Sequence, residues 1–260
     1  MELVSNSPPI MDLPVAVPDL LPQLTEFARN GDTATLEHSI RVSFLAVMAA
    51  EFEGRSAVVK SQASVAGLAH DLGKQRPEIA EVVHNGRPLT HNERRLINQH
   101  AQIGFEMLYE TGDAEQIGVR ERLGSFMGQV ALDTLFSHAN AQNIHHRGIN
   151  QGYLADLVHD GVITPTDAES HNRQISVQLV TIADVSDAFL SQGCERSYRA
   201  ARLAQEGCRT TVTPETMPQL VAATVQVPDL NIARIVPEFI RYYPTVTRIA
   251  TWLAGAIAEK

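Results

Sequence analysis

The sequence contains very little cysteine and very little lysine. Among its 260 residues there are two cysteines, Cys194 and Cys208, and lysine occurs only at Lys60, Lys74 and Lys260. The two cysteines are too far apart for the closely spaced pair of a zinc knuckle or a redox motif. We therefore interpret them as reduced thiols and expect no disulfide framework.

A basic surface and a long apolar run are also missing. The formal net charge is −9, and no cluster of Lys and Arg provides the contacts that a nucleic-acid polymer requires. No apolar stretch approaches the roughly 18 residues of a membrane span. Residues 1–22 carry no Lys or Arg and no long apolar core, unlike a secretory signal. We expect a cytoplasmic protein that binds neither a nucleic-acid polymer nor a membrane.

Strand signals are weak throughout, because no alternating run of Val, Ile and Thr is bounded by hairpin turns. Apolar residues recur instead with the period of an α-helix, which predicts an all-α fold. Capping boxes, in which Thr is followed three residues later by Glu, occur at Thr90 and Thr166. Together these patterns predict helices over residues 35–53, 56–70, 90–109, 166–190 and 245–258.

Proline marks both ends of the chain. Roughly the first 20 residues are rich in proline and aperiodic, and we expect them to form an arm. Thr213 and Pro214 are typical of an N-cap followed by proline at the first helical position. Pro228 and Pro237 are expected to divide the following region into short helices.

Histidine is abundant, and several of the ten histidines fall on apolar helical faces. His38 shares such a face with Val42 and Leu45. A single histidine there is more often a hydrogen-bonded core residue than a metal ligand. At His70 the interpretation as a metal ligand is favoured. Asp71 follows it directly, and a buried carboxylate beside an imidazole requires a compensating charge.

Further candidate ligands repeat this pattern. His100 and Asp184 each share a helical face with apolar residues, and His145 and His146 form an adjacent pair. Neighbouring residues on a helix diverge by about 100°, so both histidines can bind one ion only if it lies between them. Several helices that each direct a ligand inward are difficult to explain by packing alone, and we predict a metal centre.

The order of these residues resembles the H…HD…D signature of the HD phosphohydrolase superfamily. Four further segments are similar to its HD-GYP branch, a group of cyclic di-GMP phosphodiesterases. They are Leu89–Glu93 with Ile97, His100, Gly104 and Leu108; a degenerate GYP segment at His145–Tyr153; Ile182–Ala188; and Arg196–Arg199. The similarity covers about residues 35–205 and implies an HD-domain helical bundle with additional C-terminal helices.

This resemblance implies a centre of two divalent ions, commonly iron or manganese. The first ion would be held by His38, His70, Asp71 and Asp184, and the second by Asp71 as a bridging ligand with His100, His145 and His146. Two such cations lower the pKa of a bridging water, and the resulting hydroxide attacks the phosphate. Asp71 and Lys74 would be the catalytic residues, with Lys74 contacting a phosphate oxygen or the nucleophile, and Asp187 would orient a ligand.

The resemblance also implies a substrate, a small-molecule nucleotide. We expect a metal-dependent phosphodiesterase that hydrolyses a cyclic dinucleotide, with cyclic di-GMP as the leading candidate. Its phosphates would be bound by Arg147, Arg196 and Arg199. The GYP segment departs from the family, since Arg147 replaces a Glu and Leu154 replaces a Pro. Two alternatives stay open: an HD phosphohydrolase for another nucleotide or phosphate ester, and a catalytically silent HD domain that serves as a signalling adaptor.

The predicted organisation has three parts. Residues 1–30 are an N-terminal arm and short helix, residues 31–212 are the HD-like metal-binding domain, and residues 213–260 are a C-terminal helical extension packed on the same domain. The extension is expected to serve as a lid or as the surface of a homodimer.

Overall fold

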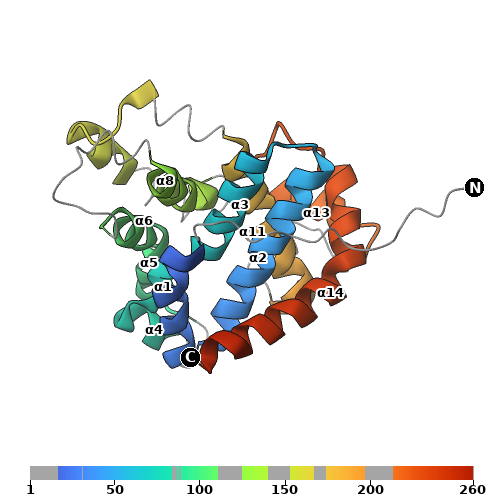
Figure 1. Ribbon diagram of the computed structural model, residues 1–260, viewed down its shortest axis with the longest axis horizontal. Helices are drawn as coiled ribbons and strands as arrows, with labels where there is room; N and C mark the ends of the chain where they lie inside the picture. Colours follow the sequence, from blue (N-terminus) through green and yellow to red (C-terminus); the bar gives the residue numbers. More distant parts are fainter. Residues whose placement is uncertain are drawn as a thin grey trace, which may run out of the picture.

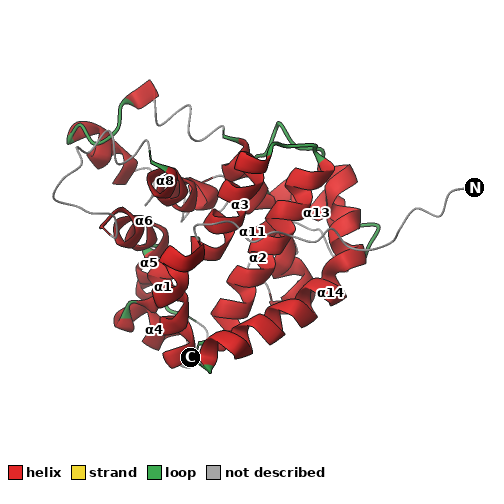
Figure 2. Ribbon diagram, viewed as in Figure 1, coloured by secondary structure: helices red, strands yellow, loops and turns green. Residues whose placement is uncertain are grey.

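The computed structural model describes residues 17–30, 32–83, 87, 89–110, 125–139, 153–166, 174–196 and 213–259. Helices dominate these ranges, and no strand occurs within them (Figures 1 and 2). The elements are α1 (Val17–Arg29), α2 (Thr33–Phe52), α3 (Ala57–Ala69), the 3-10 helix η1 (Leu72–Gln75), α4 (Pro77–Val83), α5 (His91–Ile97), α6 (His100–Glu110), α8 (Phe126–Ala139), α11 (Ile175–Arg196), α13 (Met217–Thr224) and α14 (Ile232–Ala258). The predicted all-α fold is confirmed, and none of the helices in these ranges meets the length and hydropathy that a membrane span requires.

Helices α2 and α3 begin at side chains that cap their first turns. The Asp32 carboxylate accepts a hydrogen bond from the backbone N–H of Thr35 at 3.0 Å. The Ser56 hydroxyl accepts one from Val59 at 3.4 Å. These bonds satisfy N–H groups that have no partner within the helix. The helices predicted over 35–53 and 56–70 are thus confirmed within a few residues.

The helix predicted over 90–109 is two helices. Its capping box is confirmed, because Thr90 and Glu93 exchange both expected hydrogen bonds. However, α5 ends at Ile97 with Asn98 as its C-cap, where the backbone N–H of Asn98 bonds to the carbonyl of Arg94 and that of Gln99 to the carbonyl of Leu96, and α6 begins at His100. The apolar periodicity continues across this break, so the pattern alone did not reveal it.

Two other predicted helices differ in the structure. Pro165 and Thr166 are helical, in agreement with the predicted start, but Gln174 is not helical, so α11 is a separate helix over Ile175–Arg196. Thr213 is not the N-cap of α13: its hydroxyl accepts a hydrogen bond from the N–H of Thr216 at 3.3 Å, but residues 214–216 form a turn and α13 begins only after Thr216. Local side-chain bonding of Thr competes with helix initiation in such turns.

The proline predictions are correct for Pro228 and wrong for Pro237. Pro228 lies in the turn before α14, whereas Pro237 and Pro244 both lie inside this 27-residue helix. Both prolines are exposed, so water can satisfy the carbonyls that lose their helical N–H donors. At the other end, α1 starts at Val17, which shortens the expected arm; residues 1–16 lie outside the described ranges.

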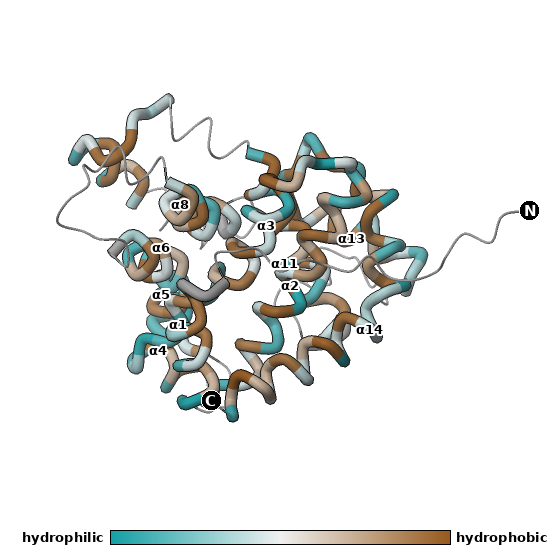
Figure 3. Tube along the Cα trace, in the orientation of Figure 1, coloured by the Kyte–Doolittle hydropathy of each residue, from teal (hydrophilic) through white to brown (hydrophobic). Residues whose placement is uncertain are grey.

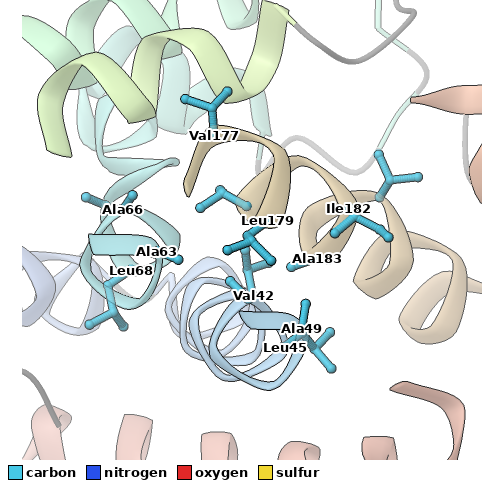
Figure 4. Packing of buried hydrophobic residues seen from close by; sticks show 14 of the residues in the cluster. Val42, Leu45, Ala49, Ala63, Ala66, Leu68, Val177, Leu179, Ile182 and Ala183 are labelled. Carbon is cyan, nitrogen blue, oxygen red and sulfur yellow. The ribbon is translucent and has the colours of Figure 1, made fainter. Parts of the chain in front are cut away.

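Helix α2 lies at the centre of the core, in contact with α3, α11 and α14. Figure 4 shows Val42 of α2 between Ala63 of α3 and Ala183 of α11, and these three side chains and Leu45 are fully buried. Apolar stretches recur along these central helices in Figure 3. Burial of such side chains contributes about 25 cal/mol per Å² of apolar surface removed from water, and it fixes α2, α3 and α11 against one another.

Glycine permits two close approaches between elements that carry predicted ligands. A Cβ on Gly67 of α3 would lie 2.7 Å from the Cα of Ser43 in α2. A Cβ on Gly73 of η1 would lie 2.0 Å from the carbonyl oxygen of His100, at the start of α6. Neither space can hold a side chain. These contacts therefore bring the end of α3, η1 and the start of α6 together beside α2.

Candidate metal centre

Four predicted ligands converge from three central helices. His38 lies on α2, His70 caps the C-terminal end of α3, Asp71 follows at the start of η1, and Asp184 lies on α11. His70 and Asp71 are each 1% exposed, and His38 and Asp184 are partly exposed. The cluster is therefore closed on the protein side and accessible on one side.

The donor atoms of this cluster are close enough to share one ion. The Nε2 atom of His38 lies 3.2 Å from Nε2 of His70, 3.5 Å from Asp71 Oδ2 and 3.4 Å from Asp184 Oδ1. The Nε2 atom of His70 lies 3.5 Å and 3.9 Å from the same two oxygens. Ligands about 2.1 Å from one cation lie about 3.0–3.5 Å from each other. His38, His70 and Asp71 alone already meet the spacing of a metal site.

The other nitrogen of each histidine is occupied by an acceptor. His38 Nδ1 lies 2.7 Å from Asp187 Oδ2, His70 Nδ1 lies 2.8 Å from the carbonyl of Gly67, and His100 Nδ1 lies 2.6 Å from the carbonyl of Ile97. These acceptors require the proton on Nδ1. In the neutral ring Nε2 then carries the lone pair, which is the arrangement in which histidine binds a metal.

Asp71 faces two groups of donors. Its Oδ2 points at His38 and His70, while its Oδ1 lies 3.2 Å from Nε2 of His100. Lys74 Nζ contacts Oδ2 at 2.5 Å and places a positive charge on the same carboxylate. A carboxylate with its two oxygens directed to separate histidine sets has the geometry of a bridging ligand.

Asp187 lies behind His38 and is fully buried. Arg41 donates two hydrogen bonds to it from one edge of its guanidinium, from Nε at 2.7 Å and from Nη2 at 3.1 Å. The hydroxyl of Tyr243, from α14, donates to Asp187 Oδ1 at 2.8 Å. Burial opposes the charge of Asp187, but His38 and Arg41 outweigh it and lower the pKa of this carboxyl. Asp187 is therefore an ionised carboxylate with fixed orientation.

His38 is also electrostatically perturbed. Burial by itself would lower the pKa of its imidazole, but hydrogen bonds to Asp184 and Asp187 raise this pKa to about 9. Without a metal the ring is thus cationic at neutral pH and holds three carboxylates together. A divalent cation at the same position would supply that positive charge instead.

The donor set fits a divalent ion such as iron or manganese. Imidazole nitrogens and carboxylate oxygens suit both metals, and the Nδ1 bonds hold the rings in the required tautomer. Of the second predicted ligand set, His100 and Asp71 lie together, while His145 and His146 fall outside the described ranges. The same is true of Arg147 and Arg199, and only the backbone of Arg196 is described, at the end of α11.

The structure adds two residues that the sequence analysis did not select, Arg41 and Tyr243. Arg41 lies one helical turn after His38, a spacing that places both on one face and that could have suggested a shared partner. Tyr243 is 56 residues from Asp187 in sequence, and no local pattern connects them.

A comparison with protein-family models matches residues 35–188 to the HD domain, which is more than half of the chain. The matched region contains His38, His70, Asp71, His100 and Asp184. Searches of curated proteins and of solved structures found no match. The family match and the convergent histidines and carboxylates lead to the same assignment: the chain belongs to the HD domain family, whose members are mostly metal-dependent phosphohydrolases.

Proposed function

We propose that this protein is a phosphodiesterase that uses two divalent ions to hydrolyse a cyclic dinucleotide, with cyclic di-GMP as the substrate. The convergence of His38, His70 and Asp71, with a proton held on Nδ1 of both rings, carries the proposal. Bound divalent ions lower the pKa of a coordinated water and neutralise phosphate charge, which is the chemistry that phosphodiester hydrolysis requires.

The protein residues contribute orientation and charge. Asp187 and the Gly67 carbonyl hold the imidazoles of His38 and His70 by their Nδ1 atoms. Lys74 is partly exposed and already contacts Asp71, so its ammonium group is positioned at the edge of the cluster. In the proposed reaction Lys74 would contact a phosphate oxygen, because bound metal would supply the positive charge that this lysine now gives to Asp71.

The proposal for cyclic di-GMP rests on sequence segments around this cluster. Leu89–Glu93 and His100 resemble the HD-GYP branch, and Thr90 and Glu93 form the capping box that starts α5. We assign phosphate contacts to Arg147, Arg196 and Arg199, whose guanidinium groups can bind phosphate oxygens in pairs.

The test is hydrolysis by protein loaded with Mn²⁺ or, without oxygen, Fe²⁺. Cyclic di-GMP is compared with a panel of other cyclic dinucleotides, nucleoside phosphates and an unspecific phosphodiester. We expect metal-dependent conversion of cyclic di-GMP to the linear dinucleotide or GMP, and its loss in His70→Ala. Hydrolysis of another nucleotide but not of cyclic di-GMP would refute the proposed substrate. Binding of a nucleotide without hydrolysis, whichever metal is loaded, would refute the enzymatic role.

The altered GYP segment favours a second candidate, a silent HD domain that binds its ligand as a signalling adaptor. Arg147 stands where the HD-GYP branch has a Glu, in a segment that shapes the substrate site of that branch. Arg147→Glu separates the two. If Arg147 binds substrate phosphate, the change weakens binding of the true ligand by the about 1.5–3 kcal/mol of a charge-assisted hydrogen bond. Gain of cyclic di-GMP turnover would instead indicate that the segment has decayed.

A further inference from the structure

Helix α14 lies outside the matched HD segment but contacts α2, the helix that carries His38 (Figure 1). Its Tyr243 is half-buried, packs against the main core cluster and points its hydroxyl at Asp187. Asp187 in turn bonds to Nδ1 of His38. A side chain far beyond the family segment is therefore two hydrogen bonds away from a metal-ligating nitrogen.

Tyr243 completes the set of donors around the Asp187 carboxylate. Oδ2 accepts from His38 at 2.7 Å and from Arg41 Nη2 at 3.1 Å. Oδ1 accepts from Arg41 Nε at 2.7 Å and from Tyr243 at 2.8 Å. An ionised carboxylate has about four acceptor positions, and all four are thus in use. A fully bonded carboxylate cannot rotate without breaking bonds, so it fixes the imidazole attached to it.

We propose that Tyr243 is a positioning residue of the metal centre: through Asp187 it aims Nε2 of His38 at the ion shared with His70 and Asp71. The C-terminal helix is then part of the functional site and not only a cover for the core. This inference rests on the proposed metal-dependent function, because it assigns Tyr243 a role in binding the ion.

The direction of the Tyr243 hydrogen bond supports this role. Burial and the negative charge of Asp187 raise the pKa of the phenol, so the hydroxyl keeps its proton and donates. The ring itself packs against the core, so removal of the oxygen alone leaves the packing intact.

The experiment compares Mn²⁺ affinity in wild type, Tyr243→Phe and Tyr242→Phe, with free Mn²⁺ measured by electron paramagnetic resonance. Tyr242 is the matched control, because it is also half-buried on α14 and its ring lies 5.3 Å from the guanidinium of Arg241. We expect Tyr243→Phe to weaken the tighter Mn²⁺ site about tenfold, as loss of a group that orients a ligand does, and Tyr242→Phe to leave it unchanged. Thermal unfolding of the metal-free proteins is measured in parallel.

A purely structural role predicts a different result. Tyr243→Phe would then lower the unfolding temperature of the metal-free protein but leave the affinity of the folded protein for Mn²⁺ unchanged, which would overturn the inference. The same conclusion follows if both Tyr→Phe changes weaken the binding of Mn²⁺ equally. If wild type binds no Mn²⁺, the proposed function fails together with this inference. If Mn²⁺ affinity is unchanged in Tyr243→Phe but lost in His70→Ala, the inference about Tyr243 is refuted and the proposed metal centre is not.

Discussion

Asp71 uses its two carboxylate oxygens for different neighbours. Oδ2 faces His38 and His70, and Oδ1 faces His100. The side chain is 1% exposed, so these neighbours and Lys74 take the place of water. A residue in this position is shared by both predicted ion sites, and its removal should affect both.

Asp71→Ala is therefore expected to abolish hydrolysis and to lower metal binding at both sites, by about a hundredfold or more in affinity. The apolar faces of the long helices do not involve this residue, so circular dichroism should show nearly unchanged helicity. Metal content is measured by inductively coupled plasma mass spectrometry. Activity at the wild-type level in this variant would contradict the assignment of Asp71.

The raised pKa of His38 predicts a pH-dependent metal affinity. His38 carries a proton up to about pH 9 in the metal-free protein, because its bonds to Asp184 and Asp187 outweigh burial. A cation can bind only after this proton leaves, so Mn²⁺ affinity should rise about tenfold per unit between pH 6.5 and 8.5. Calorimetry in buffers of different ionisation enthalpy should detect the released proton, and equal affinity across this range would contradict the prediction.

The same shift affects the stability of the metal-free protein. The folded pKa of His38 lies above its unfolded value of 6.5. The stabilisation that it provides is therefore fully present below pH 6.5 and is lost as the pH rises towards 9 and above. Bound metal should reverse this trend, because it replaces the proton.

Residues that share a helical face with apolar neighbours were the ones that the sequence could predict. His38, His70 and His100 were selected because an imidazole on an apolar face requires a partner. Asp187 was expected to orient a ligand, and it does contact His38. Tyr243 was not selected, because it lies outside the helix predicted over 245–258 and its partner Asp187 is distant in sequence and is brought close only by the fold.

At the scale of elements, apolar periodicity located the helices better than it located their ends. The break between α5 and α6 was missed because Asn98 and Gln99 interrupt the helix without Gly or Pro. A tertiary contact lies at the break: the carbonyl of His100 is against Gly73, where no side chain fits.

Gly73→Ala tests this contact. Its Cβ would lie 2.0 Å from the His100 carbonyl oxygen, so η1 and α6 must separate. We expect a loss of about 1–3 kcal/mol in urea denaturation, together with weaker metal binding as His100 moves from Asp71. Gly255→Ala is the control, because nothing lies within 4 Å of its Cβ position on α14. That change should stabilise the protein by up to about 1 kcal/mol. Equal stability of the two variants would contradict the role of Gly73.

For the whole molecule, the ligand set predicts two metal ions per chain. The predicted ligands are His38, His70, Asp71, His100, His145, His146 and Asp184. One turn before His38, Ala34 has no donor atom for a further ion, and Glu37 pairs with Arg41 at 3.7 Å. Elemental analysis of saturated protein should give a value near two. A reproducible value near three, with anomalous density beside Ala34, would contradict the prediction.

The hydrogen bond between Tyr243 and Asp187 also has an evolutionary consequence. It joins the matched HD segment to a helix outside it, so the two segments are not free to diverge independently. If position 187 loses its carboxylate, the hydroxyl at position 243 loses its acceptor and leaves a partly buried donor that costs stability. Across related chains these two positions should therefore change as a pair, and a C-terminal helix exchanged between relatives should function only where its tyrosine meets an aspartate.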